Sequence, residues 1–429
     1  MLREVTAAVT LPDTAAPEPP RLPGPVRSPV RPLRVLHLIR SLDTVFGGPA
    51  EGVRQTLRLA QAEGHAAEVL SLDDEPAGAL GLVAMPGTVH TVPGARGGYG
   101  YTPVLDEWLR AHAAGYDALV VHGLWQYHGV AARRAARACG RPYFVFSHGM
   151  LDPWFRRAHP FKHLKKQLYW LAAEHAVLRD AQAVLFTTEE EARLARQTFV
   201  PYAAQGAVVG YGAAPDETAR SSCAEDFLGL HPGLRGRRLL LFLGRLHEKK
   251  GCDLLVQAFA HVAQRQGALH LVMAGPDSQG LQARLEALAR QAGIESRVSF
   301  TGMLEGRAKW GALRAAEAFV LPSHQENFGI AVAEALAVGT PVLLSTQVNT
   351  WREVVRDGAG LADADTLEGT QRLLERWLHL PPSTRHAMRM RALACFDTHF
   401  RIEASVQRLH ALIAAAAPDS QPCNTPPRQ

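Results

Sequence analysis

Residues 318–345 read AFVLPSHQENFGIAVAEALAVGTPVLLS. An apolar run of strand length leads into a polar loop, an alanine-rich helical stretch and a second apolar run that begins at Pro341. Apolar strands joined by a helix are typical of parallel sheets that are covered on both faces. Because the ligands of such sheets bind beyond the carboxyl ends of the strands, the loop at 322–329 is a candidate functional loop.

The same alternation of strand and helix extends over most of the 429-residue chain. Apolar runs of strand length lie at 33–39, 66–72, 118–122, 143–147 and 183–187, and again at 239–243, 270–274, 298–301, 318–321 and 341–345. Between 211 and 237 the pattern lapses into sequence that carries Gly, Pro, Ser and Asp. The spacing predicts an α/β protein of two doubly wound parallel-sheet domains, at 33–212 and 213–397.

Both ends of the chain lack this periodicity. Residues 1–32 hold eight of the 28 prolines, and residues 417–429 are similar in character. Segments of this composition bury too little apolar surface to offset the entropy of ordering, so we expect a disordered arm and a disordered tail.

The overall composition is typical of an ordinary soluble globular protein. Hydrophobic residues make up 47% and charged residues 20%, and the five cysteines are scattered without a Cys-x-x-Cys pair. That pattern argues against a disulfide framework and a zinc ribbon. The start of the chain lacks the apolar core of a secretory signal, and no apolar run reaches the ~18 residues of a membrane span. We therefore expect a cytoplasmic location.

Cations gather where the first strand of the second domain ends. Gly244-Arg245 follows the strand directly, and Lys249-Lys250 begins the next helix. Arginine can bind a diphosphate through two hydrogen bonds and lysine as a point charge, although a solvated basic turn is the alternative. In the first domain Gly47-Gly48 precedes a helix, where backbone amides can approach a phosphate, but the pair taken alone also fits an ordinary turn.

Two carboxylates frame the candidate loop. Glu326 falls in the loop, and Glu334 should lie about two turns into the helix, roughly 9–12 Å away. This span matches the two ends of a nucleotide sugar, with the first helical amides near Asn327, Phe328 and Gly329 facing the phosphates. Alternatively, Glu326 is a partner of the helix dipole and Glu334 a surface charge. Glu334 lies in an otherwise apolar helix, where a carboxylate is costly unless it is paired or used.

Together these segments resemble the retaining glycosyltransferases of family 4. The resemblance rests on Gly-Arg and Lys-Lys-Gly at 244–251, Met-Ala-Gly-Pro at 273–276, Val-Ser-Phe-Thr-Gly at 298–302, and Glu-Asn-Phe-Gly at 326–329 followed by Glu334. It implies the GT-B architecture, in which two Rossmann-like domains face each other across a cleft. It also implies that a C-terminal helix within 398–416 returns to the first domain.

The resemblance further implies roles for individual residues. Arg245 and Lys250 would hold the donor diphosphate, Glu326 would contact the transferred sugar, and Glu334 would bind the ribose. Gly47 and Gly48 would belong to a loop that closes over the donor. His148, at a strand end of the first domain, would lie beside the donor sugar. His122, at another strand end, is a weaker candidate for contact with the acceptor.

A basic aromatic segment spans 154–170. It contains five Lys or Arg residues and no acid, with Phe161, Leu164 and Leu168 at helical spacing. Such a helix fits an anionic membrane surface, or else packs into the core with its basic face along the cleft. The candidate contacts with acceptor or membrane are Arg156, Arg157, Lys162, Lys165 and Lys166.

The sequence therefore predicts a hexosyltransferase-type enzyme that moves a sugar with retention from a nucleoside diphosphate to a hydroxyl of a glycan or lipid-linked acceptor. Surface or exopolysaccharide biosynthesis at the inner membrane face is the expected context. Asp73-Asp74-Glu75 is best explained as a solvated acidic turn, and we expect no metal, no cofactor and no nucleic-acid partner. The alternatives are a nucleotide-sugar epimerase and a non-catalytic adaptor of the same fold that binds RNA or a membrane.

Overall fold

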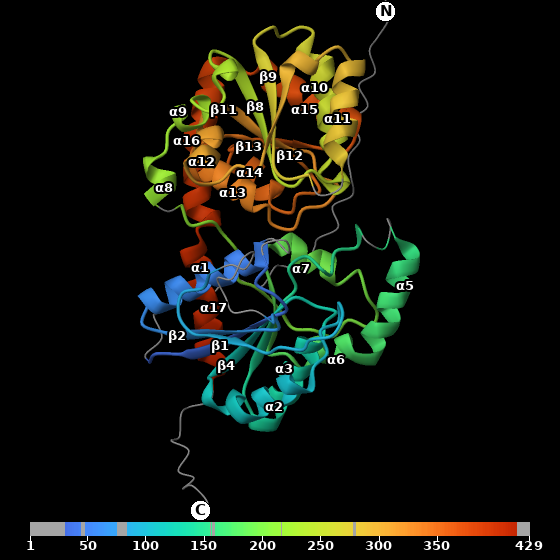
Figure 1. Ribbon diagram of the computed structural model, residues 1–429, viewed down its shortest axis with the longest axis vertical. Helices are drawn as coiled ribbons and strands as arrows, with labels where there is room; N and C mark the ends of the chain where they lie inside the picture. Colours follow the sequence, from blue (N-terminus) through green and yellow to red (C-terminus); the bar gives the residue numbers. More distant parts are fainter. Residues whose placement is uncertain are drawn as a thin grey trace, which may run out of the picture.

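The computed structural model describes residues 31–43, 48–74, 84–154, 156, 159–215, 217–277 and 280–417. These residues form two parallel sheets, one above the other in Figure 1, each flanked by helices. The first sheet has seven strands in the order β3-β2-β1-β4-β5-β6-β7, and the second has six in the order β10-β9-β8-β11-β12-β13. The prediction of two doubly wound α/β units is confirmed.

The elements of the first half alternate as the sequence predicts. Its strands are β1 (Arg34–Ile39), β2 (Ala66–Ser71), β3 (Val89–Thr91), β4 (Ala118–His122), β5 (Tyr143–Phe146), β6 (Ala183–Phe186) and β7 (Gly206–Val208). Its helices are α1 (Gly48–Ala62), α2 (Pro103–His112), α3 (Tyr127–Cys139), α5 (Pro160–Tyr169), α6 (His175–Asp180) and α7 (Glu189–Ala195), with a π-helical turn at Trp170–Glu174 between α5 and α6.

The second half repeats the arrangement after two short helices, α8 (Glu217–Ser221) and α9 (Glu225–Leu228). Its strands are β8 (Arg238–Leu243), β9 (Leu269–Ala274), β10 (Val298–Gly302), β11 (Ala316–Leu321), β12 (Val342–Ser345) and β13 (Gly360–Asp363). Its helices are α10 (Cys252–Ala263), α11 (Leu281–Gln291), α12 (Gly306–Ala315), α13 (Ile330–Ala337), α14 (Trp351–Arg356), α15 (Leu367–His379) and α16 (Pro382–Cys395).

Burial explains why the central strands read as unbroken apolar runs. In β8 every residue from Leu239 to Leu243 is buried, because helices cover both faces of the sheet. Three strands that the apolar runs did not predict, β3, β7 and β13, are the short edge strands of the two sheets. An edge strand has one neighbour and a partly exposed surface, so its sequence carries a weaker apolar signal.

The last helix, α17 (Ile402–Ala416), crosses from the second half of the chain back to the first (Figure 1). Its Leu409 and Ile413 are buried in a cluster with Val35 of β1 and Phe144 of β5. Its Ser405 hydroxyl donates a hydrogen bond to the Gly210 carbonyl oxygen at 2.9 Å. The helix therefore forms part of the core beneath the first sheet and fastens the two halves together.

Candidate active site

The carboxyl ends of strands from both sheets meet at a cavity of about 500 Å³. His148 follows β5, Thr187 follows β6, Arg245 follows β8 and Glu326 follows β11, and all four line the cavity. The first turn of α13 lines it as well, through Ile330 and Ala331. The structure therefore brings together the residues that sequence reasoning singled out around 148, 245–250 and 326–331.

The β8–α10 loop supplies three cations to this cavity, which Arg245, Lys249 and Lys250 line. Arg245 is exposed, and it has no ion pair among the described residues. Where this loop begins, Gly244 and Gly275, at the ends of β8 and β9, lie against each other. A Cβ on Gly275, whose φ is +142°, would come 1.9 Å from the Gly244 carbonyl oxygen.

Glu326 and Lys250 form an ion pair within the cavity, Nζ to Oε2. The sequence interpretation gave the two residues separate tasks, at the sugar and at the diphosphate. In the structure each holds the other in place across the ends of β8 and β11. An anion that binds here can therefore pair directly with Arg245, which has no ion pair among the described residues. It can also bind Lys250 if the ion pair between Lys250 and Glu326 opens.

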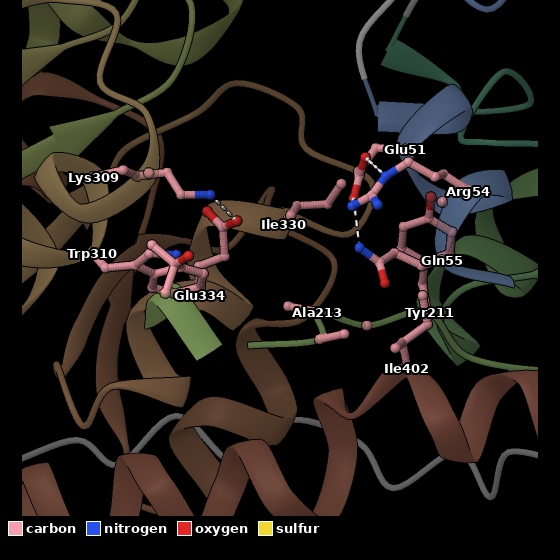
Figure 2. A pocket seen from close by; sticks show the side chains of 15 residues that line it. Glu51, Arg54, Gln55, Tyr211, Ala213, Lys309, Trp310, Ile330, Glu334 and Ile402 are labelled. Carbon is pink, nitrogen blue, oxygen red and sulfur yellow. Dashed lines mark hydrogen bonds and ion pairs between the residues drawn. The ribbon is translucent and has the colours of Figure 1, made fainter. Parts of the chain in front are cut away.

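Glu334 lies in an adjoining cavity of about 200 Å³, which also extends to α1 of the first domain. Figure 2 shows its carboxylate facing Lys309, with Glu51, Arg54 and Gln55 of α1 on the opposite side. The Lys309 Nζ is 2.7 Å from Glu334 Oε1 and lies over the Trp310 ring, 4.6 Å from its centroid. The costly carboxylate of this apolar helix is therefore paired, with Lys309, which the sequence interpretation did not identify.

The two domains contact each other around the cavities. The Asn327 Nδ2 donates to the Thr187 Oγ1 at 3.1 Å, and a Cβ on Gly149 would lie 2.8 Å from Asn327 Cβ. Gly48 packs against Ile330 of α13, since a Cβ there would come 3.0 Å from Ile330 Cδ1. Gly48, which is expected to belong to the loop that closes over the donor, thus already lies beside α13. Gly47 is outside the described residues.

His148 has a strained backbone that a buried carboxylate stabilises. Its φ is +47°, in the left-handed region that non-glycine residues rarely adopt. Glu191 of α7, only 4% exposed, accepts hydrogen bonds from Ser147 Oγ at 2.6 Å and from the Gly149 amide at 2.7 Å. Its other oxygen accepts from the amide and the hydroxyl of Thr187, both at 2.7 Å. Glu191 therefore fixes the loop that carries His148 into the cavity.

The sequence interpretation missed Glu191. Its local signal is the Thr188-x-x-Glu191 pattern of a capping box, and the Thr188 hydroxyl does accept from the Glu191 amide at 3.0 Å. That pattern predicts only a helix start. The contacts to the loop at 147–149 depend on tertiary structure that no spacing in the sequence reveals.

His122 does not fit the expected contact with an acceptor. It is buried, and both of its ring nitrogens face other histidines: Nε2 is 3.0 Å from His37 Nδ1, and Nδ1 is 3.1 Å from His148 Nε2. Burial lowers the pKa of His148 to about 4 and that of His122 well below its ordinary value, an effect that the neighbouring rings reinforce at His122. These imidazoles are therefore neutral near pH 7.

The structure excludes core packing for α5, because none of its residues is buried. The apolar row points to solvent, with exposed fractions of 88% for Phe161, 61% for Leu164, 64% for Leu168 and 59% for Leu171. Arg156, Lys162 and Lys165 are exposed as well. Lys166 instead lies over the Trp125 ring, 4.7 Å from its centroid, and burial lowers its pKa. Arg157 is outside the described residues.

Two acidic features differ from the sequence interpretation. Asp73 is more than a solvated turn, because it accepts hydrogen bonds from Ser41 Oγ at 2.5 Å and from the Leu42 amide at 2.8 Å. Glu63 and His65 gather with His410 of α17 at a spacing that could suit a metal. The His65 Nδ1 accepts from the Leu33 amide, so neutral His65 carries its proton on Nε2 and cannot ligate there. The cluster instead hydrogen-bonds α17 to the first domain, with His410 Nδ1 2.9 Å from Glu63 Oε2.

Comparisons with family models and with curated relatives agree on one kind of protein. Residues 232–393 match the model described as glycosyl transferases group 1, and residues 47–212 match the glycosyl transferase 4-like domain. The chain is 40% identical over 143 residues to a D-inositol 3-phosphate glycosyltransferase of Xylanimonas cellulosilytica, which is 33% of each chain. It is 33% identical over 128 residues to a mannosylfructose-phosphate synthase of Agrobacterium fabrum, 28% of each. The chain thus spans about a third of the length of these relatives.

Solved structures extend the likeness over the whole fold. A sucrose-phosphate synthase from Thermosynechococcus elongatus superposes with a TM-score of 0.68 at 20% identity, covering 88% of this chain and 97% of the other. Anabaena HepE in complex with UDP and glucose gives 0.68 at 18% identity, covering 88% and 98%. At these identities the likeness concerns the fold, and it confirms the two-domain GT-B architecture. No helix within the described ranges is both long and apolar enough to cross a membrane.

Proposed function

Since the chain belongs to the group 1 glycosyl transferases of family 4 type, whose two family models together match about three quarters of it, we propose that it transfers a sugar from a nucleoside diphosphate to an acceptor hydroxyl. The observation that carries this proposal is the cavity at which Arg245, Lys250 and the first turn of α13 converge. Fixed cations and helix-start amides stabilise a diphosphate, both bound in the donor and as the leaving group.

Retention, which the family resemblance implies, would proceed in this cavity by a single front-face displacement. A double displacement would need a free carboxylate against the sugar. Glu326 is the only carboxylate among the described residues that line this cavity, and Lys250 holds it in an ion pair. We propose that the leaving diphosphate accepts the proton of the acceptor hydroxyl, while Arg245 and Lys250 stabilise the growing negative charge. The same cations would do the work of a metal ion, so the proposed reaction is metal-independent.

The second cavity is suited to the nucleoside. Ile330 and Glu334 are four residues apart on one face of α13, and Ile330 lines both cavities, so this face leads from the first cavity into the second. A ribose placed at Glu334 would either bind beside the Lys309 ammonium or displace that ammonium from the carboxylate. Glu334 would then hydrogen-bond the ribose hydroxyls, as the family resemblance implies.

Thermal unfolding in the presence of UDP, GDP, ADP or dTDP tests the donor site. One nucleotide at about 100 times its Kd should stabilise the protein by about 2.7 kcal/mol, a rise in Tm of about 3 °C for a chain of 429 residues. Glu334→Ala should abolish the rise, whereas Glu368→Ala, on the exposed start of α15, should keep it. If no nucleotide raises the Tm, or if Glu334→Ala responds like the unaltered protein, the proposed donor site is wrong.

For the acceptor, we propose a lipid-linked glycan presented at an anionic membrane surface, as in surface polysaccharide synthesis. The support is α5, whose apolar row of Phe161, Leu164 and Leu168 points to solvent beside exposed basic residues and continues to Leu171 in the π-helical turn that follows. A helix that carries apolar residues on one face and basic residues beside them is suited to lie in the plane of the lipid headgroups. If two copies of this chain paired through this face, the basic residues of one copy would lie against those of the other and repel them. An anionic lipid surface therefore fits this face better than self-association does.

The membrane surface is linked to the cavity through the segment that precedes α5. The Lys249 Nζ lies over the Trp154 ring, 5.8 Å from its centroid, so the loop before α5 touches the cation-bearing loop of the second domain. α5 stands at the edge of the first domain opposite α1 and α17 (Figure 1). A lipid-linked acceptor held at α5 would therefore enter the cleft from the side at which Trp154 lies.

Sedimentation with vesicles tests the membrane proposal. The protein should bind vesicles of phosphatidylcholine and phosphatidylglycerol, and bind pure phosphatidylcholine at least 10-fold more weakly. The double variant Leu164→Ser/Leu168→Ser should lose at least 10-fold in affinity, because two inserted leucines are removed. Leu230→Ser is the matched control, since Leu230 is 65% exposed in the other domain. Equal binding by the double variant and the control would refute the assignment of α5.

A further inference from the structure

Three histidines form a continuous chain of rings that ends in the cavity. His37 lies in β1, His122 ends β4 and His148 follows β5, three strands that are neighbours in the sheet. The ring nitrogens of His37 and His122 are 3.0 Å apart, and those of His122 and His148 are 3.1 Å apart. The ring pairs are stacked, with centroids 5.3 and 5.4 Å apart. The loop stabilised by Glu191 thus places His148 at the open end of a buried chain.

Such a chain can be protonated in only two ways. Burial lowers the pKa of His37 to about 3 and that of His148 to about 4, so each ring is neutral near pH 7 and carries one N–H. In the first arrangement His37 Nδ1 donates to His122 Nε2, His122 Nδ1 donates to His148 Nε2, and His148 carries its proton on Nδ1. In the second arrangement both hydrogen bonds run in the opposite direction. In the second arrangement His148 Nδ1 is a bare acceptor, and His37 Nε2 carries a buried N–H.

The inner end of the chain decides between the two arrangements. His37 Nε2 is buried and has no hydrogen-bond partner among the described residues. A buried N–H without a partner is rarer and costlier than a bare acceptor. The adjacent His128 shows the same preference: its Nε2 donates to the His122 carbonyl oxygen at 3.0 Å, which leaves a bare Nδ1 buried. The first arrangement, with the proton on His148 Nδ1, is therefore favoured.

We propose that His37 and His122 are positioning residues that hold His148 as a hydrogen-bond donor, through Nδ1–H, toward a sugar oxygen in the cavity. This inference rests on the proposed transferase function only for the identity of the ligand. Among the described residues His148 Nδ1 has no protein partner, and the residue lines the cavity. A hydrogen-bond donor that is already oriented needs no free energy of reorganisation when a hydroxyl or ring oxygen of the sugar binds. His37, buried within the sheet, would thus determine which hydrogen bond the site can make.

The kinetic test is a double-mutant comparison. His37→Leu should lower kcat about 10-fold in the otherwise unaltered protein, while the affinity for the nucleoside diphosphate stays unchanged. In a His148→Ala background the same substitution should have no further effect, because it acts through His148. His128→Leu replaces an equally buried imidazole outside the ring chain and should leave kcat within 2-fold. An equal loss from His37→Leu in both backgrounds would overturn the proposal.

A spectroscopic readout separates this proposal from the transferase function. In protein labelled with ¹⁵N-histidine, with His148 assigned by its loss in His148→Gln, the proton of His148 should be found on Nδ1, and it should redistribute toward Nε2 in His37→Leu. A His148 proton on Nε2 in the unaltered protein would refute the chain even if the enzyme is active. If instead His148→Ala retains full activity while the Nδ1 proton is found, the chain stands and the proposed role of His148 in the reaction fails.

Discussion

Replacement of Glu191 tests how the site is held together. Its carboxylate is 4% exposed and accepts four hydrogen bonds, two at each oxygen, from Ser147, Gly149 and Thr187. Two of the four donors are backbone N–H groups, which cannot turn to another partner. We predict that Glu191→Ala and Glu191→Gln destabilise the protein to different and calculable extents.

The magnitude follows from which donors lose their acceptor. In Glu191→Ala both backbone N–H groups are left buried without a partner, at about 1–3 kcal/mol each, while the two hydroxyls can rotate. The expected loss is about 2–6 kcal/mol. In Glu191→Gln the amide oxygen keeps one pair of donors, and its NH₂ can donate to the remaining hydroxyl. One backbone N–H still faces an NH₂, so the expected loss is about 1–3 kcal/mol.

Urea unfolding at pH 7 measures these differences. The matched control is Glu189→Gln, the same substitution two residues earlier in α7 at an exposed position, where the loss should stay below about 1 kcal/mol. If Glu191→Gln unfolds at the same urea concentration as Glu189→Gln, the four hydrogen bonds do not stabilise the His148 loop, and the account of that loop is wrong.

Three further predictions concern the domain contact, the C-terminal helix and pH. Gly149→Ala should cost about 2 kcal/mol by urea unfolding, because φ is +73° and the new Cβ would lie 2.8 Å from Asn327 Cβ; an unchanged midpoint would show that the loop moves freely. Ile413→Ala should cost about 2–4 kcal/mol, since the side chain is fully buried against the first sheet; a loss below 1 kcal/mol would contradict that packing. The pKa of His37 is about 3 when folded and 6.5 when unfolded, so stability is full above pH 6.5 and falls as the pH drops below it. Between pH 7 and pH 5 the unaltered protein should therefore lose about 2 kcal/mol more than His37→Leu, and equal losses would contradict the buried neutral ring.

The strands that could be predicted from the sequence are those at the centres of the sheets. Runs such as 239–243 are buried on both faces and therefore apolar at every position. The edge strands β3, β7 and β13 have only three or four residues and are partly exposed, so nothing in their composition separates them from loops. The strand ends, and with them the position of the cavity, could be located because the central strands were identified correctly.

The site could be predicted where one loop holds all its parts. Arg245 and Lys250, or Glu326 and the first turn of α13, belong to single loops whose spacing is readable. Contacts between distant segments could not be predicted in this way. Lys309 reaches Glu334 from α12, and Glu191 reaches the His148 loop from α7. The solvent exposure of α5 was equally unreadable, because an apolar row at helical spacing looks the same whether it faces a core or a membrane.

The central claim is that the cations at the end of β8 bind the diphosphate of a nucleotide. Calorimetric titration of the stabilising nucleoside as its mono- and diphosphate tests this claim most directly, with Arg245→Met as the variant, because Arg245 is exposed and lacks an ion pair among the described residues. We predict that the diphosphate binds at least 10-fold more tightly than the monophosphate, and that Arg245→Met removes most of that difference while monophosphate binding is retained. Equal affinities for the two nucleotides, or an unchanged difference in Arg245→Met, would contradict the account.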